Sequence, residues 1–240
     1  MPSDEVAQSK QLAMGIDASL NRGLDVVVMA AGRAIRWARG GVEPEEVEAL
    51  LRKWQPGVVA IDSPPGPGCE PGRPTRECEQ RLRALGINIF STPSDADRYQ
   101  RPFYDWIREG EETFKAAARA GYLRQEYADD IEHRALEVFP HASDVFLRGC
   151  LPPARIRRRI ALKRAWRLET LRLVGVDPSG LCVNIQGNPT LDSIDAALAA
   201  LTGIRAVEGD YTAYGIASEW IIVPGSTPGP FRRCDDGPDA

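Results

Sequence analysis

Two short apolar runs that each carry an aspartate constrain the fold more than any other feature of this sequence. The first is Met14-Gly15-Ile16-Asp17-Ala18-Ser19, and the second is Val58-Val59-Ala60-Ile61-Asp62, which a Ser-Pro-Pro-Gly breaker follows. Such runs predict buried β-strands, so both carboxylates would lie at or near a strand end, partly out of water. A buried carboxylate needs a cation or a raised pKa. The two aspartates therefore suggest a shared site, although each could simply cap the following turn.

The length and composition fit one soluble domain. A chain of 240 residues can bury roughly 70% of its unfolded surface in a single core, and no apolar run approaches the roughly 20 residues that a membrane helix requires. Residues 1–10 are polar and lack the apolar core of a signal peptide. We expect a cytoplasmic protein that does not bind membranes, with a polar leader over 1–10, one domain over 11–225 and a disordered tail over 226–240.

The cysteines and histidines restrict the metal chemistry. The five cysteines are scattered, odd in number and form no C-x-x-C pair, so neither a disulfide framework nor a zinc cluster is expected. The two histidines, His133 and His141, are too few for a nitrogen-rich transition-metal site. Any metal would therefore be held by oxygen atoms. The net charge of −4 argues against nucleic-acid binding by the whole surface, although a local basic patch is present.

The order of the segments predicts a mixed α/β sheet. Three runs joined by short glycine-containing turns should form an antiparallel meander over 12–20, 24–31 and 34–38. A helix from Pro44 to Trp54 would return the chain to a strand at 58–62 that is parallel to the first. Further helices are expected over 191–207 and over 75–85, the latter capped by Thr75, with short strands at 87–90, 135–140 and 211–223.

A largely helical region, interrupted near Gly110, is expected over 99–122. Between the tyrosines at its two ends it carries the aromatic residues Phe103, Tyr104, Trp106 and Phe114. Aromatic side chains at helical spacing usually belong to a core, which is the interpretation we favour. The alternative is a lid that faces a substrate.

Three more carboxylates stand in positions of interest. Glu137 lies in the run 135–140 among apolar neighbours, where strand alternation alone would point it outward. Asp192 and Asp195 are one turn apart at the start of the last helix, so both carboxylates lie on one face. Taken alone, acids in a first turn are explained by the helix dipole.

One segment concentrates positive charge. Residues 155–172 hold eight basic residues and one acid, Glu169. On a helix, Arg159, Lys163 and Arg167 lie four apart and share a face. This stripe is either an ordinary solvated face or, because the whole chain is acidic, a distinct contact surface for a phosphate backbone.

Taken in order, these pieces resemble a widespread uncharacterised family of bacterial and archaeal proteins described as predicted nucleases with a ribonuclease H-like fold. The match runs from Leu12 to Val223 and rests on Gly-Ile-Asp-Ala, Ala-Ile-Asp-Ser-Pro, a helix that begins Arg76-Glu-Cys-Glu79, Glu137-Val-Phe-Pro140, Lys163 with Arg167 and Leu171, and Asp192-x-x-Asp195-Ala-Ala-Leu. Two features depart from a minimal ribonuclease H, namely His141, where an acid is more usual, and a helical insertion over about 97–125.

The resemblance implies a three-layer α/β fold with helices on both faces of a mixed five-stranded sheet, whose first three strands are antiparallel and whose next two are parallel. It places Asp17 on the central first strand, Asp62 at the end of the fourth, and Asp195 with Asp192 on the last helix, all as metal ligands. Glu137 would join them in catalysis. The substrate would contact Arg76, His141, Arg159, Lys163 and Arg167.

The chemistry asks for the same residue types. Hydrolysis of a phosphodiester needs an activated water, stabilisation of charge on the phosphate and help for the leaving oxygen, which two magnesium ions about 4 Å apart can supply. Magnesium prefers hard oxygen ligands, and a cation relieves the repulsion among clustered carboxylates. We therefore expect a Mg²⁺- or Mn²⁺-dependent nuclease that acts on DNA or RNA. The alternatives are a non-catalytic nucleic-acid or protein-binding module and, less favoured at this length, a phosphotransferase of the actin and sugar-kinase type.

Overall fold

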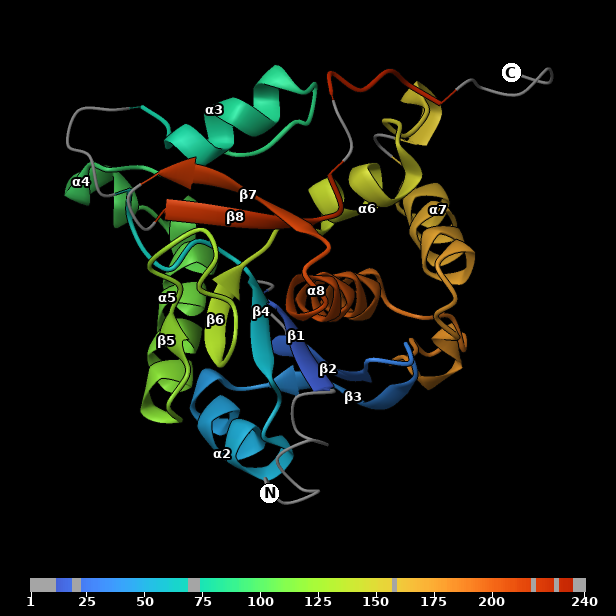
Figure 1. The fold of residues 1–240 in the computed structure, drawn as a ribbon, viewed down its shortest axis with the longest axis horizontal. Coiled ribbons are helices and arrows are strands. Elements are labelled where there is room, and N and C mark those ends of the chain that lie inside the picture. Colours follow the sequence, from blue (N-terminus) through green and yellow to red (C-terminus); the bar gives the residue numbers. More distant parts are fainter. Residues whose placement is uncertain are drawn as a thin grey trace.

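A mixed sheet of six strands lies at the centre of the domain (Figure 1). The computed structural model describes residues 12–18, 23–68, 74–156, 159–216, 219–226 and 229–234. In spatial order the strands are β3 (Ile35–Val42), β2 (Leu24–Ala30), β1 (Leu12–Asp17), β4 (Val58–Asp62), β6 (Arg134–Glu137) and β5 (Leu123–Arg124). Strands β1 to β3 form an antiparallel meander, and β4, β6 and β5 run parallel to β1. This antiparallel-then-parallel order confirms the mixed sheet expected from the sequence.

The sheet has six strands where five were predicted, and two other predicted strands also differ. The sixth strand, β5, has two residues and is too short to leave a periodic signal. Residues 87–90 do not form a strand. The apolar run at 211–223 supplies two strands, β7 (Tyr211–Ile216) and β8 (Glu219–Pro224), which form a separate antiparallel hairpin. This hairpin touches the end of the main sheet through a bridge between Val138 and Ile222.

Helix α8 (Leu191–Val207) lies against one face of the sheet and is buried over most of its length (Figure 1). Its alanines allow a very close approach to β1. A Cβ atom on Gly15 would lie 2.0 Å from the carbonyl oxygen of Ala196 and 2.3 Å from the amide nitrogen of Ala200, so only glycine fits there. Side chains alternate along a strand. Asp17, two residues beyond Gly15, therefore points toward the α8 side of the sheet.

Helices α2 (Pro44–Trp54) and α5 (Asp105–Arg119) cover the opposite face, so the domain has three layers. Apolar side chains of β1, β2 and β4 alternate toward these helices and form one core cluster with side chains of α2 and α5. The strands contribute Met14, Ile16, Val26, Val28, Val59 and Ile61, and the helices contribute Val47, Leu51 and Phe114. The predicted interruption of the helix near Gly110 is wrong, because α5 runs through it. A Cβ on Gly110 would lie 1.8 Å from the hydroxyl oxygen of Ser63, so this glycine permits close packing against the end of β4.

The remaining helices are α3 (Glu77–Ala84), α4 (Ala96–Tyr99), α6 (Pro140–Arg148) and α7 (Ile160–Leu173), with short 3-10 turns at 102–104, 154–156 and 178–180. Helix α3 begins one residue later than predicted, since Arg76 and not Thr75 is its N-cap. The backbone amide of Arg76 and the hydroxyl of Thr75 both donate to the carboxylate of Glu79, at 3.2 and 2.6 Å. In the described part of the chain, no helix combines the length and apolar character needed to cross a membrane.

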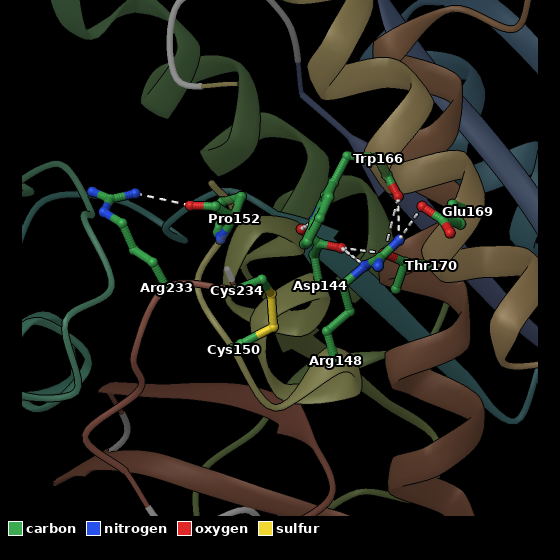
Figure 2. The surroundings of a disulfide bond; sticks show 9 residues. All are labelled: Asp144, Arg148, Cys150, Pro152, Trp166, Glu169, Thr170, Arg233 and Cys234. Carbon is green, nitrogen blue, oxygen red and sulfur yellow. Dashed lines mark hydrogen bonds and ion pairs between the residues drawn. A yellow bond between two sulfur atoms is a disulfide. The ribbon is translucent and has the colours of Figure 1, made fainter. Parts of the chain in front are cut away.

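The C-terminal segment differs from the predicted disordered tail over residues 229–234. Phe231 is buried against the domain, Arg233 forms a β-bridge with Leu151, and a disulfide joins Cys150 to Cys234 (Figure 2). The cysteine spacing does not predict this bond, because the two residues are 84 positions apart. The predicted leader over 1–10 and residues 227–228 and 235–240 of the predicted tail lie outside the described residues.

Candidate functional site

Asp17 and Asp62 lie side by side at the carboxyl ends of two neighbouring parallel strands, where they are paired in register. Val58 and Ala60 both face Gly203 of α8, so Asp62 points to the same side of the sheet as Asp17. A hydrogen bond joins the two carboxyl groups. Burial, reinforced by the charges of nearby carboxylates, raises the pKa of Asp17 well above its usual range and the pKa of Asp62 to about 7. Both carboxyl groups therefore hold their protons to a higher pH than an exposed aspartate does.

Helix α8 brings two more aspartates to this point. Asp195 is buried and forms an ion pair with Arg167 of α7. Its negative charge raises the pKa of both Asp17 and Asp62, and Asp192, which is half-buried, raises that of Asp17 more weakly. The four aspartates singled out in the sequence thus gather on one face of the sheet.

Strand β2 adds a buried carboxylate that the sequence analysis does not identify. Asp25 lies opposite Asp17 in the antiparallel register. The hydroxyl of Thr190 donates to Asp25 at 3.5 Å, and the same hydroxyl caps α8 by accepting from the amide of Ser193 at 3.1 Å. The signal that could reveal Asp25 is the register of the β1–β2 hairpin, because the hydrophobic pattern alone says only that it lies near the start of an apolar strand.

The predicted basic stripe divides into residues of different character. Arg167 is buried and paired with Asp195, so it does not belong to a solvated face, whereas its contact with a phosphate stays a prediction. Burial and the nearby charge of Arg167 lower the pKa of Lys163, whereas Asp195 and Asp62 act in the opposite direction, which places this half-buried ammonium beside the aspartates. Arg159 is exposed at the start of α7. Of the three basic residues in the stripe, Arg167 is therefore buried, Lys163 lies beside the aspartates and Arg159 is exposed at the surface.

Polar contacts with α6 fix the helix that carries Lys163 and Arg167. The guanidinium of Arg148 stacks over the ring of Trp166 at 3.8 Å and donates to the carbonyl of Trp166 at 2.8 Å (Figure 2). The indole N–H of Trp166 donates to Asp144 at 2.9 Å. These bonds hold α7 in register with α6, so the side chain of Arg167 remains directed at Asp195.

Glu137 and Arg76 engage each other and not the aspartates. The guanidinium of Arg76 donates to both oxygens of Glu137, at 2.5 and 2.7 Å, and its Nε donates to Glu79 at 2.9 Å. All three side chains are buried. Burial acts to raise the pKa of Glu79, but Arg76 and two hydroxyl donors hold it below its usual value, whereas burial keeps the pKa of Glu137 raised despite Arg76. Glu79, which the sequence analysis did not select as a site residue, completes this cluster.

Two cavities meet at Asp62. The first, which we call the aromatic cavity, has a volume of about 430 Å³ and its ring-bearing walls are Phe90, Phe103, Trp106 and Phe139. The second, which we call the basic cavity, has a volume of about 620 Å³ and is lined by His141, Lys163, Trp166, Arg167, Asp195 and Arg233 among others. Asp62, Phe90 and Phe139 border both. Burial and the charges of Arg167 and Lys163 lower the pKa of His141 to about 3, so this ring is neutral at physiological pH.

The aromatic residues of the helical insertion serve two purposes. Tyr104 and Phe114 are buried, as predicted for a core. Phe103 is exposed, and with Trp106 it lines the aromatic cavity, which is the arrangement expected of a substrate-facing element. The core interpretation therefore holds for part of this set only.

The acidic cluster contains ligands of the kind that a hard cation takes. Among the described residues, no three His, Cys, Asp or Glu side chains are arranged to hold a metal ion together, and Asp195 is engaged by Arg167. Asp17 and Asp62 nevertheless face each other through carboxyl oxygens, the ligands that Mg²⁺ and Mn²⁺ prefer. A divalent cation at this pair would offset the negative charge of the two carboxylates, so the donor chemistry fits such an ion.

Comparison with known proteins identifies the family of this chain. Searches of curated proteins and of solved structures find no significant match. A family model described as "Protein of unknown function (DUF429)" matches residues 15–219, which include all four aspartates of the cluster. The chain therefore belongs to the protein family of unknown function DUF429.

Proposed function

We propose that this protein is a divalent-metal-dependent nuclease with a ribonuclease H-like arrangement of acids. The observation that carries the proposal is the carboxyl pair of Asp17 and Asp62 at the ends of neighbouring parallel strands, with Asp195 and Asp192 on the helix above them. Burial and the negative charge of Asp195 raise the pKa of both Asp17 and Asp62. A cluster of this kind is favourable only when a positive charge compensates it.

The topology supports the same proposal. A meander of three antiparallel strands is followed by parallel strands, and an aspartate ends both the first strand and the fourth. The last long helix, α8, then crosses the face to which both aspartates point. This is the order of elements and acids that the resemblance to a ribonuclease H-like fold implies.

The residues take distinct roles in the proposed reaction. Asp17 and Asp62 would hold Mg²⁺ or Mn²⁺, which when bound supplies positive charge for the phosphate and lowers the pKa of a water molecule. Both carboxyls must lose their protons to act as ligands, so binding releases protons from the pair. Lys163, beside the aspartates, would hold a non-bridging phosphate oxygen. Arg167 positions Asp195 through their ion pair, and its charge opposes the rise that burial causes in the pKa of Asp195.

The proposal is tested by cleavage of labelled single- and double-stranded DNA and RNA in Mg²⁺ or Mn²⁺. We expect cleavage by the wild type and a loss of more than about 100-fold in Asp17→Asn and Asp62→Asn, with substrate affinity largely kept. Asp129→Asn, which removes one exposed carboxylate elsewhere, is the matched control and should keep full activity. Inactivity of the wild type on all four substrates, or full activity of either site variant, would overturn the proposal.

One observation favours a second candidate, a nucleic-acid-binding module without turnover. The ion pair between Arg167 and Asp195 neutralises a carboxylate that a two-metal site would use. A module of this kind would bind nucleic acid with a salt-dependent affinity and release it uncut. The cleavage assay separates the two candidates.

A further inference from the structure

Two phenylalanine rings stand exposed at the mouth of the aromatic cavity. Phe90 and Phe103 are 64% and 60% exposed, and their rings lie edge to face with centroids 6.1 Å apart. Phe103 also packs against the buried Tyr104, with ring centroids 5.0 Å apart, and this contact stabilises the position of its ring. Large rings gathered at the entrance of a cavity mark a binding surface more often than single apolar residues scattered over a protein do.

The inner walls of the cavity continue this apolar surface. Trp106 and Phe139 add two flat rings. Apart from Asp62, the charged groups that line the cavity are Arg76, Glu79 and Glu137, which bond to one another, and the hydroxyl of Thr92 donates to Glu79 at 2.5 Å. A volume of about 430 Å³ falls within the roughly 300–1,000 Å³ typical of ligand pockets. The cavity thus offers flat stacking surfaces more than open hydrogen-bonding groups.

The position of the cavity indicates what kind of molecule carries the ring. Asp62 borders both this cavity and the basic cavity, whose lining also holds Asp144 and Asp195. Trp166 donates to Asp144 and Arg167 pairs with Asp195, while Lys163 and Arg233 supply further positive charge. A ligand that uses both would join a flat apolar ring to an anionic group held by Lys163 and Arg233. A nucleotide within a polynucleotide strand has this combination.

We infer that the aromatic cavity takes an unpaired nucleobase, which makes single-stranded nucleic acid the substrate of this protein. The inference rests on the proposed function, because the phosphate next to the stacked base would then lie at the aspartates. A base inside a duplex is stacked between its neighbours and must leave the helix to enter such a cavity. Stacking depends little on base identity, so binding should tolerate many sequences.

The test is the binding of short labelled strands without divalent metal, so that no strand is cut. The probes are oligothymidylate, oligouridylate, an abasic strand of equal length and a duplex, which separate DNA from RNA and base from phosphate. We expect the wild type to bind both base-bearing strands more tightly than the abasic strand or the duplex. Replacing both exposed rings, Phe90→Ala with Phe103→Ala, should weaken binding of base-bearing strands by roughly 5- to 150-fold and leave abasic binding unchanged. Tyr127→Ala removes a ring of similar exposure (62%) outside the cavity and should change nothing.

The outcomes distinguish this inference from the proposed nuclease activity. Equal affinity for abasic and base-bearing strands, equal affinity for the duplex, or unchanged binding by the double variant would overturn the inference even if the wild type cleaves nucleic acid. Base-dependent binding that the double variant loses, together with no cleavage in Mg²⁺ or Mn²⁺, would support the aromatic cavity and overturn the nuclease. The single variant Phe103→Trp, which keeps a stacking surface, should bind base-bearing strands with most of the affinity of the wild type.

Discussion

Removal of the Arg76 side chain tests whether the Arg76, Glu79 and Glu137 cluster holds the fold or acts on substrate. Arg76 is 5% exposed and makes three charge-assisted hydrogen bonds of 2.5 to 2.9 Å to two buried carboxylates. Arg76→Ala would leave both carboxylates without their cation. Breaking a buried ion pair in this way costs about 3–5 kcal/mol of unfolding free energy. For a chain of this length, that loss lowers Tm by roughly 6–20 °C.

Urea unfolding followed by circular dichroism measures this loss, and Arg81→Ala in the same helix is its control. The side chain of Arg81 is 48% exposed and makes an ion pair with Glu77 at 3.0 Å, so its removal should cost only about 0.5 kcal/mol. A folded Arg76→Ala protein as stable as Arg81→Ala, but impaired in substrate binding, would refute the structural role. It would return Arg76 and Glu137 to the substrate-facing roles that the family resemblance implies.

Three further predictions concern the aspartate pair, the disulfide and the close packing of α8. The pKa of Asp62 is raised to about 7 in the folded protein, so the unfolded chain releases this proton at lower pH and the wild type without metal loses stability from about pH 4 to pH 7. Relative to the wild type, Asp62→Asn should therefore gain on the order of 2 kcal/mol of unfolding free energy between pH 5 and pH 7.5, measured by denaturation in the presence of a chelator. Reduction of the bond between Cys150 and Cys234 should cost about 4–5 kcal/mol, whereas a variant with serine at both positions should not respond to dithiothreitol in thermal unfolding. Gly15→Ala should cost more than about 3 kcal/mol in urea unfolding, because the added methyl group would overlap the backbone of α8.

Much of the site could be predicted because its acids are tied to strong local patterns. Asp17 and Asp62 end apolar runs, and such runs pair as parallel strands once a helix connects them, which brings the two ends together. Asp192 and Asp195 lie in the first turns of a helix rich in alanine that packs against the same strands. Local pattern thus predicts both the elements and the edge of the sheet where they meet.

The partners of charged groups could not be predicted in the same way. Arg167 and Asp195 are 28 residues apart on different helices, and their contact depends on how α7 packs against α8. A periodic pattern shows which face of a helix is apolar but not which buried acid a basic side chain will meet. The exposure of Phe90 and Phe103 could not be predicted for a similar reason, because the residues around them resemble those around ordinary core aromatics.

The most direct measurement of the central claim is the affinity for Mn²⁺, followed by electron paramagnetic resonance of the free ion. If Asp17 and Asp62 form the cation site, the wild type binds Mn²⁺, each of Asp17→Asn and Asp62→Asn binds at least about tenfold more weakly, and Asp129→Asn binds as the wild type does. Mn²⁺ binding that is equal in all four proteins, or absent from the wild type, would contradict the account.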